Sequence, residues 1–329
     1  MIPGRVAVSP SRVLVLGGTG FVGRSLVARL SADGAGPRVV VPSRRPARAK
    51  ALAMLPGVEL LAADVHDEAT LVRLLAGCDA VVNLVAVLHG HATRFQQVHV
   101  ELPRKLARAC HAAGVRRLLH VSALGVPAQA EQAPSHYLAS KARGEAVLHA
   151  AAAEFGLDVT VLRPSVIFGA DDRFINLFAA LQAWSPFVPL AGADARFQPV
   201  WVEDVAAALL RCLHDRSTFD QTCECAGPDV YRLRDLVALA GQWSGHARPI
   251  IALPMALGRV QAALLSLLPG EPLMSADNLA SMRTPNVASG TLPGLAQLGI
   301  HPAGLASVMP AVLAQGPAEM DRWRRAAGR

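Results

Sequence analysis

Tyr137 and Lys141 are the side chains in this sequence best suited to proton transfer. A spacing of four residues places both on one face of a helix. The chain has two tyrosines and three lysines, so chance gives such a pair in only about two of a hundred chains of this composition. A neighbouring ammonium favours the phenolate, so Tyr137 could exchange a proton with a substrate alcohol. Ser122, at the end of the preceding strand, would orient a carbonyl oxygen.

A second signal is the run RVLVLGGTGFVGRSLVARL, in which an apolar strand leads into a glycine-rich turn and directly into a helix. Gly17 permits the tight turn, Gly20 lets the backbone approach a pyrophosphate, and Gly23 lets the helix pack on the strand. The free N–H groups at the helix start favour negative charge. The pattern predicts a dinucleotide-binding turn, and an unused structural turn is the alternative.

The end of the second predicted strand bears on the choice of dinucleotide. Enzymes that use NAD place an acidic residue there for the ribose 2′-hydroxyl, whereas this chain has Ser43, Arg44 and Arg45. A guanidinium makes charge-assisted hydrogen bonds to a 2′-phosphate. The sequence therefore favours NADP(H), with NAD(H) as the second choice. In the alternative interpretation the two arginines only solvate a helix start.

The first half of the chain alternates short apolar runs with amphipathic segments, which predicts a doubly wound parallel sheet of the α/β class. The strands are expected at residues 13–16, 39–41, 59–62, 80–87, 117–121 and 159–162. The helices are expected at residues 21–30, 70–75, 98–113 and 140–155. Glycines that suit helix ends follow them at Gly34, Gly77, Gly114 and Gly156.

The rhythm of strands and helices breaks after Pro164, where loops rich in proline and glycine appear. We expect a dinucleotide-binding domain over residues 11–164 and a smaller C-terminal lobe over residues 165–329, interleaved with the first. The apolar segment 254–269 predicts a helix too short to span a bilayer. It would either pack on the protein or lie on a membrane surface or partner.

Composition excludes several classes of protein. Hydrophobic residues make up 52% and charged residues 17%, which fits a globular core rather than a disordered chain. The net charge of +7 is spread along the chain, so no nucleic-acid partner is expected. The five cysteines form no disulfide framework and no metal-ligand pattern, and no signal peptide is visible. We expect a protein of the reducing cytosol that binds no metal.

Together these motifs resemble the extended or atypical branch of the short-chain dehydrogenase/reductase superfamily, which includes epimerases and dehydratases. Over nearly its whole length the chain is similar to the subgroup of NADPH-binding accessory subunits of respiratory complex I and their bacterial relatives. That similarity rests on the segments SHYLASKARGEAVL, LRPSVIFGADDRFINLFAAL, FQPVWVEDVAAAL, PLMSADNLASM and LPGLAQLGI.

The resemblance implies a set of cofactor contacts. It places the pyrophosphate on Gly17, Thr19, Gly20, Phe21, Val22 and Gly23, and the 2′-phosphate on Ser43, Arg44 and Arg45. It places adenine at Asp64 and Val65, the nicotinamide ribose at Tyr137 and Lys141, and the carboxamide at Pro164, Ser165 and Val166. Leu84, Val85 and Ala86 replace the Asn-Ala-Gly-like turn of the superfamily, which leaves a more apolar wall beside the cofactor.

Several functions fit these features. The first is an NADP(H)-dependent oxidoreductase for a hydrophobic carbonyl or alcohol, such as a quinone- or isoprenoid-like compound, with Tyr137, Lys141 and Ser122 as catalytic residues. The second is a non-catalytic subunit or assembly factor of the respiratory NADH:ubiquinone oxidoreductase that holds NADPH, peripheral at the inner face of the membrane. A sensor of the NADPH/NADP ratio and a nucleotide-sugar epimerase or dehydratase are further alternatives. The sequence leaves the oligomeric state open.

Overall fold

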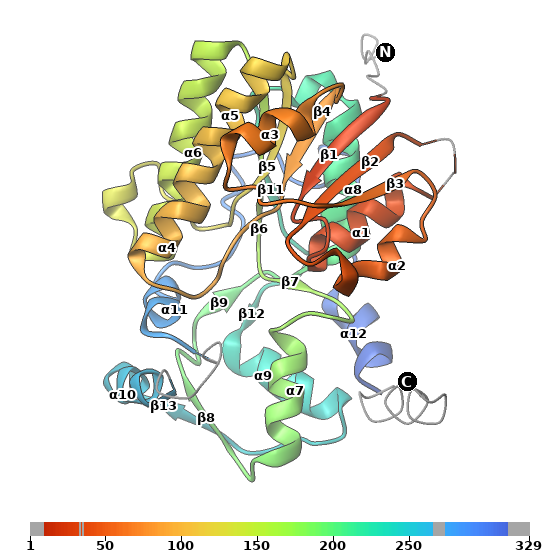
Figure 1. Cartoon of the computed structure of the whole chain (residues 1–329). Coiled ribbons are helices and arrows are strands. Elements are labelled where there is room, and N and C mark those ends of the chain that lie inside the picture. The colour runs from red at the N-terminus through yellow and green to blue at the C-terminus, as the bar shows by residue number, and fades with distance from the viewer. Residues whose placement is uncertain (1–9, 33, 35, 266–273, 315–329) are drawn as a thin grey trace. The chain divides into compact units, whose positions relative to one another are not determined.

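The computed structural model describes residues 10–32, 34, 36–265 and 274–314 (Figure 1). The chain divides into two compact units. The first contains the chain up to Pro164 together with Val202–Cys225 and Ala288–His301. The second contains Ser165–Trp201, Ala226–Val287 and the chain from Pro302 onward. We describe the two units separately.

The first unit is built on a seven-stranded sheet whose neighbouring strands pair in parallel. In spatial order its strands are β11 (Thr222–Cys225), β6 (Asp158–Pro164), β5 (Arg117–Val121), β4 (Ala80–Asn83), β1 (Arg12–Leu16), β2 (Arg38–Ser43) and β3 (Val58–Ala62). The chain order reverses between β1 and β4. In sheets of this kind, ligands bind at the carboxyl ends of the two strands between which the order reverses.

Helices cover both faces of this sheet, as Figure 1 shows for α1 and α8 on one face and α3, α5 and α6 on the other. The helical segments are α1 (Phe21–Leu30), α2 (Lys50–Ala53), α3 (Glu68–Leu75), α4 (Ala92–Gln96), α5 (Leu102–Ala113), α6 (His136–Phe155), α8 (Val202–His214), the π-helical turn η2 (Gln97–Glu101) and the 3-10 turns η1 (Pro46–Ala49), η3 (Ala130–Gln132) and η4 (Arg216–Thr218). The predicted doubly wound α/β fold is confirmed.

Local sequence signals explain where these helices begin and end. Asp67 caps α3, because its side chain accepts the N–H of Thr70, and Ser135 caps α6 in the same way. Gly114 and Gly156 end α5 and α6 in the left-handed conformation, as predicted. The prediction for Gly34 is wrong, because α1 ends at Leu30 and Ser31 caps it.

The predicted strand 80–87 is too long, because β4 ends at Asn83. Beyond that point side chains replace the sheet ladder as hydrogen-bond partners. The N–H of Val85 donates to Asn83 Oδ1 at 3.2 Å, and the N–H of Val87 donates to His99 Nε2 at 3.2 Å. The apolar run therefore leaves the sheet without leaving these backbone donors unpaired.

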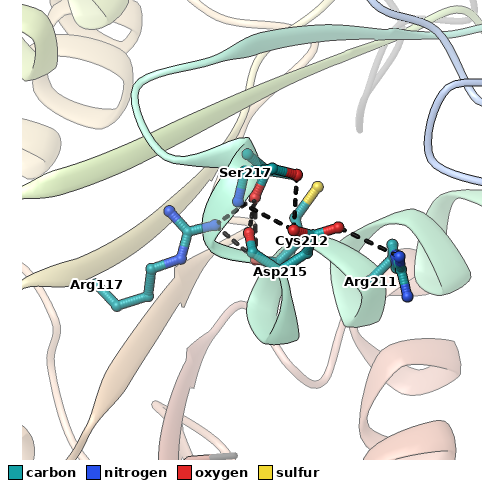
Figure 2. A network of polar contacts seen from close by, with 6 residues as sticks. Arg117, Arg211, Cys212, Asp215 and Ser217 are labelled. Carbon is teal, nitrogen blue, oxygen red and sulfur yellow. Dashed lines mark hydrogen bonds and ion pairs between the residues drawn. The ribbon is translucent and has the colours of Figure 1, made fainter. Parts of the chain in front are cut away.

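A buried arginine ties the end of α8 to the sheet (Figure 2). Arg117 on β5 donates to the carbonyl oxygens of Asp158 and Cys212, at 2.8 and 2.6 Å, and its guanidinium lies 4.3 Å from the ring centroid of Phe219. Burial lowers the pKa of Arg117 to about 10. The guanidinium still carries its charge at neutral pH. The contacts of this buried cation hold the turn after α8 against the start of β5.

All five cysteines are buried free thiols. Cys223 and Cys225 lie on β11, which confirms their interpretation as strand residues. Among the described residues, no group of three histidine, cysteine or acidic side chains is placed to hold a metal ion. Nor does any described helix combine the length and apolar character needed to cross a bilayer.

The second unit has three two-stranded sheets and a group of helices around its own apolar core. Its elements are β7 (Ile167–Phe168), α7 (Ile175–Trp184), β8 (Val188–Ala191), β9 (Arg196–Phe197), β10 (Val200–Trp201), β12 (Tyr231–Arg232), α9 (Leu233–Trp243), β13 (Ile250–Leu253), α10 (Met255–Leu265), α11 (Ala276–Ser281) and α12 (Leu305–Ala314). Phe168, Phe178 and Phe197 pack in this core, whereas Trp184 is 92% exposed.

Helix α10 presents large side chains to solvent and small ones to the protein. Leu257 and Val260 are 54% and 56% exposed, while Ala262 is buried. A Cβ on Gly258 would lie 2.4 Å from the Cβ of Ala191, so this glycine permits close packing on β8. The described part of the predicted helix therefore packs on the protein through its small residues and leaves Leu257 and Val260 exposed. Residues 266–269 of that prediction lie outside the described residues.

Candidate functional site

The glycine-rich turn joins β1 to α1, and its geometry explains each glycine. Gly17 has a φ of 77°, and a Cβ at this position would lie 3.1 Å from the carbonyl carbon of Leu84. A Cβ on Gly23 would lie 2.3 Å from the carbonyl oxygen of Gly17, which no side chain tolerates. Gly23 thus lets α1 start directly against the turn itself. No side chain caps this helix start, and no acidic residue lies in its first turn, so it suits an anion.

Ser43 is the last residue of β2, and Arg44 and Arg45 follow it. The Ser43 hydroxyl accepts the N–H of Arg45 at 3.2 Å, and both arginine side chains are exposed. Burial lowers the pKa of nearby His66, and the positive charges of Arg94, Arg44 and Lys105 lower it further. Arginine and lysine side chains from three elements therefore surround this corner of the first unit, a setting that suits a phosphate.

A cavity of about 420 Å³ lies close to these cations. It is lined by His66, Gln97, Glu101, Leu102 and Lys105. His66 follows Asp64 and Val65, the residues predicted to contact adenine, and Asp64 Oδ1 accepts the N–H of His66 at 3.0 Å. Lys105 Nζ donates to the carbonyl oxygen of His66 at 2.7 Å. Sequence reasoning missed these α5 and η2 residues, because they come from a different part of the chain.

Leu84, Val85 and Ala86 form the loop that follows β4. The N–H of Leu84 donates to the carbonyl oxygen of Leu16 at 2.9 Å, which holds the loop against the end of β1. The hydrogen bonds of Val85 to Asn83 and of Val87 to His99 hold the rest. The backbone of Leu84 and Val85 therefore lies beside Gly17, and the Val85 side chain packs against the core of the first unit.

Helix α6 carries the predicted proton-transfer pair. Ser135 caps this helix, which places Tyr137 in its first turn and Lys141 one turn further on. Tyr137 also packs against the segment that follows β5, beside Ala123 and Val126. Ser122 begins that segment, and its buried Oγ has no hydrogen-bond partner among the described residues. The structure thus brings α6 and the segment that follows β5 into contact at Tyr137.

Burial raises the pKa of Tyr137 to about 12. Burial also lowers the pKa of Lys141 to about 8, against the opposing effect of Glu145. Lys141 Nζ donates to the carbonyl oxygen of Val121 at 3.0 Å. Burial therefore governs the pKa of Tyr137 in this structure, and the phenol is protonated at neutral pH. That the Lys141 ammonium favours the phenolate during the reaction stays a prediction.

Glu145 lies one helical turn beyond Lys141, is buried, and pairs with Arg163 on β6. The guanidinium Nε donates to Glu145 Oε1 at 3.0 Å, and Nη2 donates to Oε2. This two-point contact fixes the rotamer of Arg163 and anchors α6 to the sheet.

Two buried histidines lie behind the pair, and the sequence analysis missed both. His99 from η2 stacks on Phe95 and lies nearly perpendicular to Tyr137, with 5.5 Å between ring centroids. His120 on β5 receives a hydrogen bond from Asn83 Nδ2 on its Nδ1 at 3.1 Å. Burial and the positive charge of Lys141 lower the pKa of His99 to about 2 and that of His120 to about 3. The sequence signal for both was a histidine inside an apolar segment, His99 in residues 98–113 and His120 in residues 117–121.

The predicted carboxamide contacts are split between the two units. Pro164 ends β6 in the first unit, and its carbonyl oxygen accepts the N–H of Leu124 at 2.9 Å. Ser165 and Val166 belong to the second unit, where Asn286 Oδ1 accepts both the Ser165 hydroxyl and the Val166 N–H. Asn286 was not singled out from the sequence.

The parallel sheet, its reversal of strand order and the uncapped glycine-rich helix start define a Rossmann-type dinucleotide-binding protein. Residues 13–222 match the NAD dependent epimerase/dehydratase family, and the chain belongs to that family.

Among curated proteins, the chain is 31% identical over 311 residues to the mitochondrial NADH dehydrogenase (ubiquinone) 1 alpha subcomplex subunit 9 of Mus musculus, covering 92% of this chain and 79% of the relative. It is 34% identical over 200 residues to the ceramide reductase of Caulobacter vibrioides, covering 60% of this chain and 59% of that protein. Among solved structures, MoeE5 in complex with UDP-glucose and NAD aligns with a TM-score of 0.68 at 22% identity, over 94% of this chain and 99% of MoeE5. That likeness concerns the fold alone.

Proposed function

We propose that this protein is an NADP(H)-dependent reductase of a hydrophobic carbonyl compound, with Tyr137 as the proton donor. The observation that carries the proposal is the placement of Tyr137 and buried Lys141 on α6, where Tyr137 packs against the segment that follows β5 and Lys141 Nζ donates to the carbonyl oxygen of Val121 at 3.0 Å. Reduction of a carbonyl needs an acid at its oxygen, and a phenol held neutral supplies one.

The roles of the residues follow from their chemistry. When bound, the reduced nicotinamide would supply the hydride for the carbonyl carbon, and the residues of the chain would bind and orient the reactants and move the proton. The Tyr137 hydroxyl gives its proton to the carbonyl oxygen, and the Ser122 hydroxyl orients that oxygen by a hydrogen bond. Lys141 holds the nicotinamide ribose and stabilises the phenolate that remains after proton transfer. Pro164, Ser165 and Val166 are proposed at the carboxamide end.

A hydrophobic substrate is proposed because Leu84, Val85 and Ala86 carry no polar side chain in the loop whose backbone lies beside Gly17. A relative named a ceramide reductase is consistent with a long-chain substrate. A nucleotide-sugar would need polar partners, and this loop supplies none from its side chains.

Hydride transfer from NADPH is the direct test. The NADPH complex should be mixed without oxygen with a long-chain aliphatic ketone, a short-chain prenyl quinone and UDP-glucose in turn, and the loss of NADPH absorbance recorded. We expect oxidation by the ketone or the quinone and none by UDP-glucose. A complex that stays reduced with all three would contradict the proposal.

The second candidate function is a subunit that holds NADPH without turnover, at a respiratory complex and peripheral to the inner face of the membrane. It is favoured by the 31% identity to a mitochondrial complex subunit, which extends over 92% of this chain. The same mixing experiment separates the two candidates, because a holder keeps its cofactor bound and reduced.

The preference for NADP(H) is proposed to reside in Ser43, Arg44 and Arg45. Replacing both arginines with alanine is expected to raise the NADPH dissociation constant about a hundredfold, because two charge-assisted hydrogen bonds to the 2′-phosphate are lost. NADH affinity should change by less than about threefold, because NADH lacks that phosphate. Titration by nicotinamide fluorescence measures both constants.

Arg48→Ala is the matched control, since Arg48 is an exposed arginine on the adjacent turn η1. It should leave both dissociation constants unchanged. If the double variant weakens NADPH and NADH equally, the 2′-phosphate does not bind at these residues.

A further inference from the structure

We propose that His99 is a positioning residue that couples the loop after β4, at the proposed cofactor site, to the helix that carries Tyr137 and Lys141. Its catalytic consequence rests on the proposed function, whereas its effect on cofactor affinity and on the ionisation of Tyr137 does not.

The two ring nitrogens of His99 contact two different elements. Nε2 accepts the N–H of Val87 at 3.2 Å, at the end of the loop that follows β4. Nδ1 lies 2.8 Å from the Oγ of Ser140 on α6. The Ser140 hydroxyl in turn donates to the carbonyl oxygen of Tyr137 at 2.7 Å. A continuous chain of hydrogen bonds therefore runs from Val87 to the backbone of Tyr137.

The direction of each bond in this chain is determined. The N–H of Val87 can only donate, so Nε2 must carry a lone pair. The single proton of the neutral ring is then on Nδ1 and points to Ser140, whose own proton is committed to Tyr137. A second proton on the ring would face the N–H of Val87. The arrangement thus selects the neutral ring with its proton on Nδ1. The other tautomer would break the hydrogen bond from Val87.

The backbone at His99 makes a second, independent contact with α6. A Cβ on Gly144 would lie 2.0 Å from the carbonyl oxygen of His99, so the helix approaches η2 as closely as only glycine allows. η2 is a π-helical turn, a rare conformation that often marks functional positions. His99 therefore contacts α6 twice, with its side chain at Ser140 and with its backbone one turn later at Gly144.

The side chain also fixes the orientation of the Tyr137 ring. The planes of the two rings meet at 84°, with Phe95 packed against both. His99 and Phe95 are each 1% exposed, so the tyrosine ring packs against two buried rings. Any shift of the Val87 loop that moved His99 would therefore reach both the backbone and the ring of Tyr137.

Two substitutions separate the two arms of His99. In His99→Asn, the amide nitrogen replaces Nδ1 and can still donate to Ser140, but nothing accepts the N–H of Val87. In His99→Gln, the longer side chain places an oxygen near the Nε2 position for Val87, but the donor to Ser140 is lost. Each variant keeps one of the two hydrogen bonds of His99, so one variant should change cofactor affinity and the other the behaviour of Tyr137.

We expect His99→Asn to raise the NADPH dissociation constant about tenfold, because the loop loses its anchor. We expect His99→Gln to leave that constant within about threefold and to lower the rate of hydride transfer about tenfold to a hundredfold, because Tyr137 is displaced. Ser140→Ala removes the middle of the chain and should resemble His99→Gln. It also keeps the test open if either His99 variant fails to fold.

Ionisation of Tyr137 supplies a readout that needs no turnover. The chain has only two tyrosines, so Tyr231→Phe leaves Tyr137 as the single phenol that absorbs as tyrosinate. In this background, His99→Gln should let Tyr137 ionise at lower pH, nearer its ordinary pKa of about 10, because a loosened ring gains access to water. His99→Asn should not. Circular dichroism at each pH confirms that the chain stays folded.

The proposal is overturned if both His99 variants change cofactor affinity and Tyr137 ionisation equally, or change neither. Failure of the proposed reductase function gives a different result. In that case neither the variants nor the wild-type protein oxidise NADPH. His99→Asn still weakens NADPH binding, and His99→Gln still lets Tyr137 ionise at lower pH.

Discussion

Tyr137→Phe is expected to slow carbonyl reduction about a thousandfold while NADPH affinity stays within about threefold of the wild-type value. The substitution removes the hydroxyl that gives its proton to the carbonyl oxygen. The remaining ring still packs against Phe95 and His99, so the fold around α6 should be retained. Single-turnover oxidation of bound NADPH by the substrate, followed without oxygen, measures the chemical step directly.

Tyr231→Phe is the matched control, because Tyr231 is the other tyrosine of the chain and lies on β12 in the second unit. It should reduce the substrate at the wild-type rate. A Tyr137→Phe variant with unchanged turnover would show that the proton comes from another group. Turnover absent from both Tyr137→Phe and wild-type protein would favour the subunit that only holds NADPH.

The pH dependence of the two directions provides a further check on the same residue. With its pKa raised to about 12, Tyr137 is protonated across the neutral range and ready to act as an acid. The rate of reduction should therefore show no loss of the tyrosine proton between about pH 6 and pH 9. Oxidation of the alcohol needs the phenolate, so its rate should rise with pH over the same range.

Lowering the pH from about 7 to about 5 is expected to reduce the free energy of unfolding by about 4 kcal/mol through His99 and His120. Both rings stay neutral in the folded chain, with pKa values lowered to about 2 and about 3. In the unfolded chain each ring takes up a proton below its ordinary pKa near 6.5. The unfolded state therefore binds more protons, and stability falls as pH falls.

Urea unfolding at the two pH values, followed by tryptophan fluorescence, measures this loss. Carboxylates contribute little in that window, because their ordinary pKa values lie near 4. Replacing His120 with glutamine should remove about half of the loss, whereas His91→Gln should leave it intact, because His91 is exposed. Equal unfolding free energies at both pH values would mean that these two rings are protonated in the folded state.

Most of the first unit follows from local patterns in the sequence. The strand–glycine–helix run determined β1, its turn and α1, because the positive φ of Gly17 and the close approach of Gly23 to Gly17 are requirements of this short segment. Gly114 and Gly156 determined helix ends for the same reason, since a left-handed residue is a local requirement. The spacing of Tyr137 and Lys141 likewise followed from helix geometry alone.

The protonation states of the candidate site depended on contacts between distant segments. Lys141 meets the carbonyl oxygen of Val121, twenty residues away in the chain, and burial rather than this ammonium governs the pKa of Tyr137. The predicted strand 80–87 was too long for a similar reason. Beyond Asn83 the chain leaves the sheet, and the N–H of Val87 donates to the side chain of His99 instead of to a neighbouring strand.

The sequence by itself therefore determined the class of fold, the glycine-rich turn and the placement of Tyr137 and Lys141 on one helix, because periodicity, turn chemistry and helical spacing are properties of neighbouring residues. Only the tertiary structure decided that burial raises the pKa of Tyr137, that His99 and His120 are buried as neutral rings, and that one histidine joins the β4 loop to α6. Burial and hydrogen-bond partners come from segments that meet only when the chain folds, so no local pattern could reveal them.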